Sequence, residues 1–264
     1  IKLNIGNLAA FGFDSPEEIQ QDIIRNLPNA AGYTDSKGIF AARKAIMHYC
    51  QQKHIKGVTL EDIYVGNGVS ELIVMAMNAL LDAGDEVLVP APDYPLWTAA
   101  ISLSGGTPRH YLCDENNGWY PDLDDIRSKI TSKTRAIVII NPNNPTGTWF
   151  SSADLDACLS KVPPDVLVVA DEAYIEYVTD PALVSALALR ERYPNLIVSR
   201  TFSKAYGLAG LRAGYLVADR SLVRLLEPVR ESFNLNMMAL AAAEAALSDA
   251  THLQSVRESN AMER

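Results

Sequence analysis

Four short segments of the sequence carry side chains of distinctive chemistry, and each of them follows an apolar run. The segments are Pro92-Asp93-Tyr94-Pro95, Asn141-Pro142-Asn143-Asn144-Pro145-Thr146-Gly147, Asp171-Glu172-Ala173-Tyr174 and Thr201-Phe202-Ser203-Lys204. The amine of Lys204 can act as a nucleophile and as a general acid or base. Each segment alone has a simpler explanation, such as a solvated lysine, a turn, or an aspartate that caps a helix. Their combination and order indicate one chemical site.

The apolar runs before these segments indicate the fold that positions them. They cover residues 86–90, 135–140, 165–170 and 196–200. Runs that are apolar almost throughout are typical of parallel strands covered by helices on both faces. Helical patterns at 38–53 and 69–81 precede them, so the sequence predicts an α/β fold with a mostly parallel, doubly wound sheet. Because ligands of such sheets bind beyond the carboxyl ends of the strands, we expect the four segments to meet at one edge.

Further patterns predict an anion site and two more helices. The turn Gly66-Asn67-Gly68-Val69-Ser70 follows a strand-like run at 62–65 and opens a helix. Its backbone N–H groups can face an anion with the helix dipole behind them. Ser15-Pro16-Glu17-Glu18 has capping-box spacing, which predicts a helix from there to about Asn26. The apolar stretch 237–247 predicts a buried helix.

Composition excludes several classes of protein. The 264 residues are 48% hydrophobic and carry a net charge of −9, so the clustered cations that nucleic acids and anionic membranes require are not evident. No apolar run approaches the roughly 20 residues that span a bilayer. Cys50, Cys113 and Cys158 lie far apart without histidines in a ligand pattern, which indicates neither a metal site nor disulfides. We therefore expect a cytoplasmic protein with small-molecule partners, and no nucleic acid or membrane.

The four segments together resemble the pyridoxal-phosphate-dependent aminotransferases of class I/II, which have fold type I, over essentially the whole chain. The resemblance implies that Lys204 forms a Schiff base with pyridoxal 5′-phosphate and then moves the proton between substrate and cofactor. It implies that Asp171 pairs with the protonated pyridine nitrogen and keeps the ring an electron sink. Tyr174 and Asn144 would donate hydrogen bonds to the phenolic oxygen. Lys204, Asp171 and Tyr174 are thus the expected catalytic residues.

The same resemblance assigns the remaining contacts. Tyr94 would stack on the pyridine ring, while Asn144 and Gly6 would approach the substrate. Tyr33 would reach across a homodimer interface to the partner's cofactor phosphate. The phosphate of the chain's own cofactor would be bound by backbone amides, a hydroxyl and a guanidinium, which belong to Gly68, Val69, Ser70, Ser203 and Arg212.

Different parts of the chain resemble two different groups within this family. Residues 1–149 resemble glutamate–pyruvate (alanine) aminotransferases, as in Gly66–Ile73 and Pro90–Ala100. Residues 164–247 resemble histidinol-phosphate aminotransferases, as in Val168–Tyr177 and Arg200–Arg212. The chain therefore resembles a hybrid, and its amino donor can be alanine or histidinol phosphate, with 2-oxoglutarate or another 2-oxo acid as the acceptor.

The expected organisation has three parts: an N-terminal segment over 1–35, a large cofactor-binding domain over 36–249, and over 250–264 the start of a connection to a small domain. We expect that small domain beyond Arg264, outside this sequence, with the arginines that choose the substrate. Three alternatives stay open. A C–S lyase would use the same Lys, Asp and Tyr set. A non-catalytic regulator would use the fold to sense the cofactor, and a fragment without the small domain could be inert.

Overall fold

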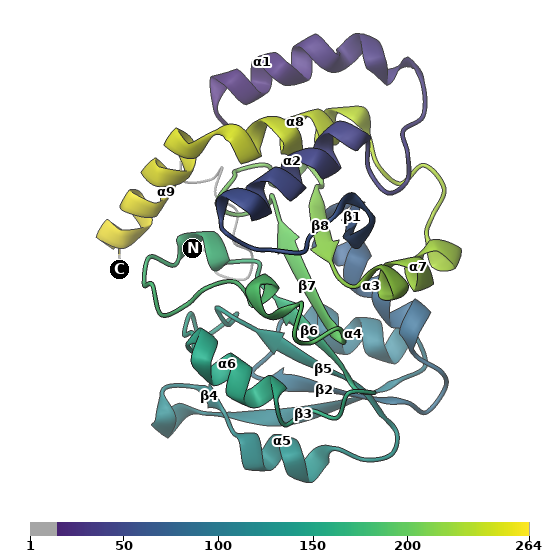
Figure 1. The fold of residues 1–264 in the computed structure, drawn as a ribbon, viewed down its shortest axis with the longest axis vertical. Coiled ribbons are helices and arrows are strands. Elements are labelled where there is room, and N and C mark those ends of the chain that lie inside the picture. The colour runs from purple at the N-terminus through teal and green to yellow at the C-terminus, as the bar shows by residue number, and fades with distance from the viewer. Residues whose placement is uncertain (1–14, 264) are drawn as a thin grey trace.

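The computed structural model describes residues 15–263, and a single eight-stranded sheet forms its centre (Figure 1). The strands are β1 (Ile63–Gly66), β2 (Glu86–Ala91), β3 (Thr107–Asp114), β4 (Tyr120–Pro121), β5 (Thr134–Ile140), β6 (Leu167–Asp171), β7 (Leu196–Thr201) and β8 (Gly214–Val217). Their order in the sheet is β1-β8-β7-β6-β5-β2-β3-β4. Strands β8 and β4 run antiparallel to their neighbours, whereas β7, β6, β5, β2 and β3 are parallel. The predicted, mostly parallel α/β sheet is confirmed.

The four strands expected to carry the site lie side by side as β7-β6-β5-β2. Because all four are parallel, their carboxyl ends share one edge, as the sequence predicted. Their side chains are almost entirely buried, and in β7 all six residues are. This burial on both faces explains why the runs are continuously apolar rather than alternating.

Helices cover both faces of the sheet. They are α1 (Glu17–Asn26), α2 (Phe40–Gln52), α3 (Gly68–Leu80), α4 (Pro95–Leu103), α5 (Leu123–Lys129), α6 (Ser152–Leu159), α7 (Arg220–Leu226), α8 (Met237–Ser248) and α9 (Ala250–Glu263). Successive strand residues point to opposite faces. In β6, Val168 and Ala170 join a core with α2, α6 and α8, whereas Val169 joins a core with α3, α4 and α7. Helix α1 packs on α8 at the outside of the molecule (Figure 1).

Several local predictions can be compared with the structure. The predicted helices at 38–53, 69–81 and 237–247 are α2, α3 and α8. The capping box at Ser15 is wrong: α1 begins at Glu17 with Pro16 as its N-cap, and no side chain caps it. The carbonyl of Ser15 instead accepts a hydrogen bond from the side chain of Gln20 at 2.7 Å. The helix still ends at Asn26, as expected.

Two further sequence expectations concern cysteines and membranes. The three cysteines are free and buried. Within residues 15–263, no group of three His, Cys, Asp or Glu side chains is placed to hold a metal ion. Over the same residues, none of the helices has the length and apolar character needed to cross a membrane.

Candidate functional site

A cavity of about 190 Å³ lies beyond the carboxyl ends of the parallel strands. It receives residues from all four predicted segments and from the start of α3, which confirms that the fold brings them to one edge. The lining residues are Val69, Ser70, Tyr94, Ile140, Asn144, Asp171, Ala173, Tyr174, Thr201, Ser203, Lys204 and Arg212. A second cavity of about 360 Å³ shares Asn144, Tyr174 and Lys204 with the first. Lys204 therefore borders both cavities.

Asp171, the last residue of β6, carries a buried carboxylate without a cationic partner. Its side chain is 3% exposed, and no ion pair within 4 Å reaches it from the described part of the chain. Oδ2 accepts a hydrogen bond from Trp97 Nε1 at 3.0 Å, and Oδ1 accepts one from the Ala173 amide at 3.1 Å. Burial raises the pKa of Asp171 to about 6, opposed by these two hydrogen bonds. The carboxylate is held in place and still has lone pairs for a cationic N–H.

Tyr174, Asn144 and Lys204 form a polar group next to this carboxylate. The Asn144 side-chain amide donates to the Tyr174 hydroxyl at 3.2 Å. Burial and the charge of Asp171 raise the pKa of Tyr174, while the hydrogen bond from Asn144 lowers it. The phenol therefore keeps its proton, and because its oxygen already accepts from Asn144, that proton is free to be donated elsewhere. The Lys204 ammonium lies 5.5 Å from the centre of the Tyr174 ring.

The start of α3 and Arg212 form a cradle suited to an anion. No side chain caps α3, so the first amides of the helix are available to a ligand. Gly68 has a φ of +74°, and a Cβ there would lie 2.5 Å from Arg212 Nη2. The guanidinium thus lies directly against the helix start. Arg212 itself has a left-handed φ of 58°, which is uncommon for a residue other than glycine and occurs at functional sites.

Gly214 lets β8 approach the backbone of the cradle closely, which leads to a testable prediction. A Cβ at Gly214 would meet only backbone, at 2.7 Å from Val69 N and 3.0 Å from Gly68 C. Gly214→Ala must therefore shift the helix start, and we expect a loss of about 1–3 kcal/mol of unfolding free energy in urea. Displacing amides from a phosphate should also weaken pyridoxal-phosphate binding by about 10-fold or more.

A matched control for this change is Gly210→Ala. The Gly210 site is exposed and has nothing within 4 Å of an added Cβ. Its unfolding free energy is expected to stay within about 0.5 kcal/mol of the parent. Equal stability and equal cofactor affinity in the two variants would show that the close approach of β8 does not shape the cradle.

The other predicted site residues lie as follows. Tyr94 is the N-cap residue of α4, and Ser203 precedes Lys204; both line the smaller cavity. Tyr33 does not line it: its ring is 80% exposed and stacks on Phe233 with centroids 3.9 Å apart. Gly6 lies outside the described residues.

Sequence reasoning missed two residues that contribute to the site. Trp97 supplies the indole donor to Asp171, although it lies in the apolar helix α4, where a core position is the ordinary explanation. Its buried polar atom was the only signal, since indole N–H groups in a core need an acceptor. Thr201 lines the cavity and accepts a hydrogen bond from the Ser203 amide at 3.0 Å. It belongs to the Thr201–Lys204 segment but was assigned no contact.

Comparison with known proteins identifies the family. The family model for aminotransferase class I and II matches residues 1–264. Glutamate-pyruvate aminotransferase AlaA of Escherichia coli (strain K12) is 56% identical over 220 residues, which are 83% of this chain and 54% of that protein. Histidinol-phosphate aminotransferase 1 of Mannheimia succiniciproducens is 40% identical over 256 residues, which are 96% of this chain and 66% of that protein. Both groups suggested by the sequence are thus relatives. The likeness to AlaA extends beyond residues 1–149, because 220 residues are aligned.

A solved structure extends this result to the fold. Histidinol-phosphate aminotransferase from Sinorhizobium meliloti, solved in complex with pyridoxal-5′-phosphate, superposes with a TM-score of 0.85 at 26% identity and covers 95% of this chain and 66% of its own. The chain spans about half the length of the curated relative AlaA. Because the family model matches the chain from end to end, the chain belongs to the class I and II aminotransferases, whose cofactor is pyridoxal 5′-phosphate.

Proposed function

We propose that this chain binds pyridoxal 5′-phosphate and transfers an amino group between an amino donor and a 2-oxo acid such as 2-oxoglutarate. The observation that carries the proposal is the buried, unpaired carboxylate of Asp171 in one cavity with Lys204. An ionised carboxylate is costly to bury alone. A cationic ring nitrogen would remove that cost. Lys204 lowers the pKa of Asp171 from a distance, but no cation of the described residues lies within 4 Å of the carboxylate.

The residues around the cavity fit the cofactor at three points. The amides of Gly68, Val69 and Ser70, together with Ser203 and Arg212, would hold its phosphate at the cradle. Asp171 would hold the ring nitrogen. Tyr94 lines the same cavity and would cover one face of the ring.

The chain's own residues account for the proton movements of the reaction. When bound, the cofactor supplies an aldehyde that condenses with amines and a ring that accepts electrons. Lys204 Nζ would remove the proton at the substrate Cα and return it, a role worth about 10²–10⁴-fold in rate. Tyr174 would donate its phenolic proton to a neighbouring oxygen, oriented by Asn144. Asp171 would keep the ring nitrogen protonated.

The substrate is proposed from the relatives. Identity to AlaA favours alanine with 2-oxoglutarate, and histidinol phosphate is the second donor to test, because its aminotransferase aligns over 96% of this chain. The decisive experiment adds pyridoxal phosphate to the protein, follows the visible absorbance of the bound cofactor, and then assays both donors. Amino transfer to 2-oxoglutarate supports the proposal. Release of pyruvate from cystathionine without transfer would instead assign a C–S lyase.

We also propose that the protein acts as a homodimer in which Tyr33 contacts the partner subunit's cofactor phosphate. Two exposed rings support this, since Tyr33 is 80% and Phe233 56% exposed, and they stack on each other at the surface. Aromatic residues are enriched at protein interfaces. Sedimentation of the protein at two concentrations tests the dimer, and a monomer with undiminished cofactor affinity would overturn the role of Tyr33.

A further inference from the structure

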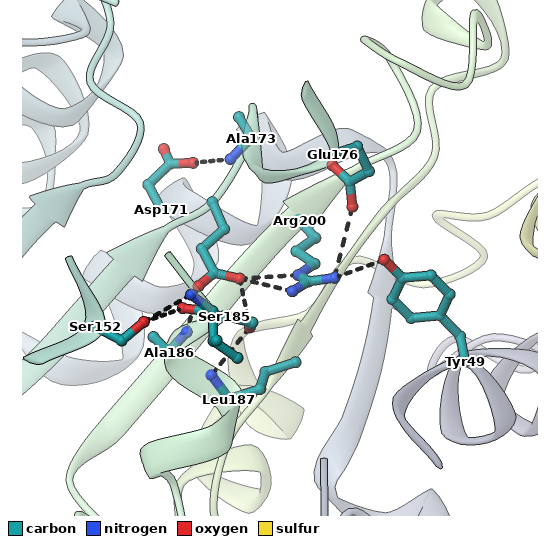
Figure 2. Close-up of polar contacts among 11 residues, drawn as sticks. Tyr49, Ser152, Asp171, Ala173, Glu176, Ser185, Ala186, Leu187 and Arg200 are labelled. Atoms are coloured by element: carbon teal, nitrogen blue, oxygen red, sulfur yellow. Dashed lines mark hydrogen bonds and ion pairs between the residues drawn. The ribbon is translucent and has the colours of Figure 1, made fainter. Parts of the chain in front are cut away.

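A buried ion pair joins Arg200, at the end of β7, to Glu172, which follows the last residue of β6; Figure 2 shows the contacts of Arg200. Arg200 donates from Nε and Nη2 to Glu172 Oε2 at 3.0 and 2.8 Å. Both side chains are 3% exposed. Neither residue lines the cavity. The pair therefore has no direct contact with cofactor or substrate in the proposed reaction.

Strand geometry places this pair on the face opposite to the site. Asp171 ends β6 and Glu172 follows it, so their side chains point to opposite faces. Arg200 and Thr201 alternate in the same way at the end of β7, and Thr201 lines the cavity with Asp171. The backbone continues the parallel register here, because the Glu172 amide donates to the Ser199 carbonyl at 3.0 Å. Each member of the ion pair is thus covalently adjacent to a residue of the cavity.

The ion pair is anchored on all sides. Glu172 also accepts hydrogen bonds from the Ser185 hydroxyl at 2.7 Å and from the Ala186 amide at 2.5 Å. Arg200 Nη1 donates to the Tyr49 hydroxyl of α2 at 3.3 Å and lies 3.5 Å from Glu176 Oε1 (Figure 2). Such a fully bonded pair is directional, which apolar contacts are not.

A buried ion pair is weak evidence for stability, because apolar residues of similar volume often replace one without loss. Its distinctive property is to fix one geometry through charge-assisted hydrogen bonds. We propose that Arg200 and Glu172 are positioning residues, which hold the ends of β6 and β7 in the register that sets Asp171 against Lys204. This role rests on the proposed function, because the reaction needs Asp171 and Lys204 in a fixed arrangement.

The expected size of the effect follows from the reaction. Asp171 ends β6 and Lys204 follows the end of β7 by three residues, and Arg200 and Glu172 connect these two strand ends. A misplacement of about 1 Å between reacting groups can lower a rate about 10²-fold. Removing the pair should therefore lower kcat by about that factor and leave KM nearly unchanged.

The test replaces both charges together, as Arg200→Met with Glu172→Met, so that neither partner stays buried alone. Glu176 can then take up a proton, since burial raises its pKa to about 7 against the opposing charge of Arg200. The control is Arg190→Met with Asp62→Met, a second buried pair at 3.4 Å that does not line the cavity. Asp62 also accepts hydrogen bonds from the Thr59 amide and hydroxyl, at 2.8 Å each, so the control likewise leaves buried donors without their acceptor.

Amide hydrogen exchange of the cofactor-free protein gives the first readout. In the Arg200 and Glu172 double variant, residues 171–177 and 201–204 are expected to exchange about 10-fold faster or more, because charge-assisted hydrogen bonds are lost. In the control those segments should exchange at the parent rate. Arg200→Lys keeps a cation but loses the two-pronged guanidinium, so its exchange rates in these segments should lie between those of the parent and the double variant.

Turnover gives the second readout. A drop of about 10²-fold in kcat for the Arg200 and Glu172 double variant, with the control near the parent rate, supports positioning. Parent-like exchange in both segments, or a parent-like kcat, overturns it. A parent protein without cofactor absorbance would contradict the proposed function, and the exchange result would still decide whether the pair positions the two strand ends.

Discussion

Replacing Lys204 with alanine is expected to lower kcat for amino transfer by about 10⁴-fold, the upper end of what a positioned acid and base contributes. The variant should also lose the visible absorbance of cofactor bound through the lysine. Lys204 is half-buried and borders both cavities, so no other described lysine can replace it there. Stopped assays of amino transfer and an absorbance spectrum with added cofactor measure the two effects.

Stability separates this prediction from misfolding. The Lys204 ammonium makes no ion pair within the described residues, and its contact with the Tyr174 ring is worth about 0.5–1 kcal/mol. The unfolding free energy should therefore change by no more than that. Lys161→Ala, at an exposed lysine, is the control and should keep the parent's rate. A Lys204→Ala protein that retained transfer within about tenfold of the parent would reject the assigned role.

Much of the site could be predicted because it follows from one rule of α/β sheets. Four apolar runs predicted parallel strands, and parallel strands present their carboxyl ends at one edge. That rule alone places Tyr94, Asn144, Asp171 and Lys204 together, although up to 110 positions separate them. The helix start at Gly68 was predictable for a separate reason, since a glycine turn after a strand exposes amides.

The rest of the site depends on tertiary packing that sequence periodicity does not record. The strands β3, β4 and β8 were missed. β3 is an exposed, polar run, β4 has only two residues, and β8 comes just after the Lys204–Arg212 run that was assigned to the site. The ion pair of Arg200 and Glu172 was hidden because each residue lies beside a more conspicuous one. Ser15 has the spacing of a capping box, but Pro16 is the N-cap residue of α1, so the Ser15 side chain does not cap the helix.

Asp171→Asn should separate stability from function. The folded pKa of about 6 lies above the ordinary 3.8, so the folded state prefers the protonated carboxyl. The stability that this preference gives the folded state is fully present below about pH 3.8 and is lost as the pH rises through about 6. The difference corresponds to about 3 kcal/mol against the folded state at pH 8. Burial raises the pKa of Glu176 from 4.5 to about 7, so the stability of both the parent and the Asp171→Asn variant also declines as the pH rises through this range.

The asparagine variant avoids ionisation, but one of its two hydrogen-bond partners, Trp97 or the Ala173 amide, then faces an N–H group at a cost of about 1 kcal/mol. Without cofactor it should thus be about 2 kcal/mol more stable than the parent at pH 8 and no more stable at pH 4. Its kcat should fall about 10³-fold, because the ring nitrogen loses its charged partner. Asp180→Asn is the matched control, since Asp180 is exposed and accepts from the Ala182 amide with the same spacing. Urea unfolding at pH 8 and pH 4 measures the unfolding free energies of the variant and the parent. If the variant were no more stable than the parent at either pH, the carboxylate of Asp171 would not be buried without a charged partner.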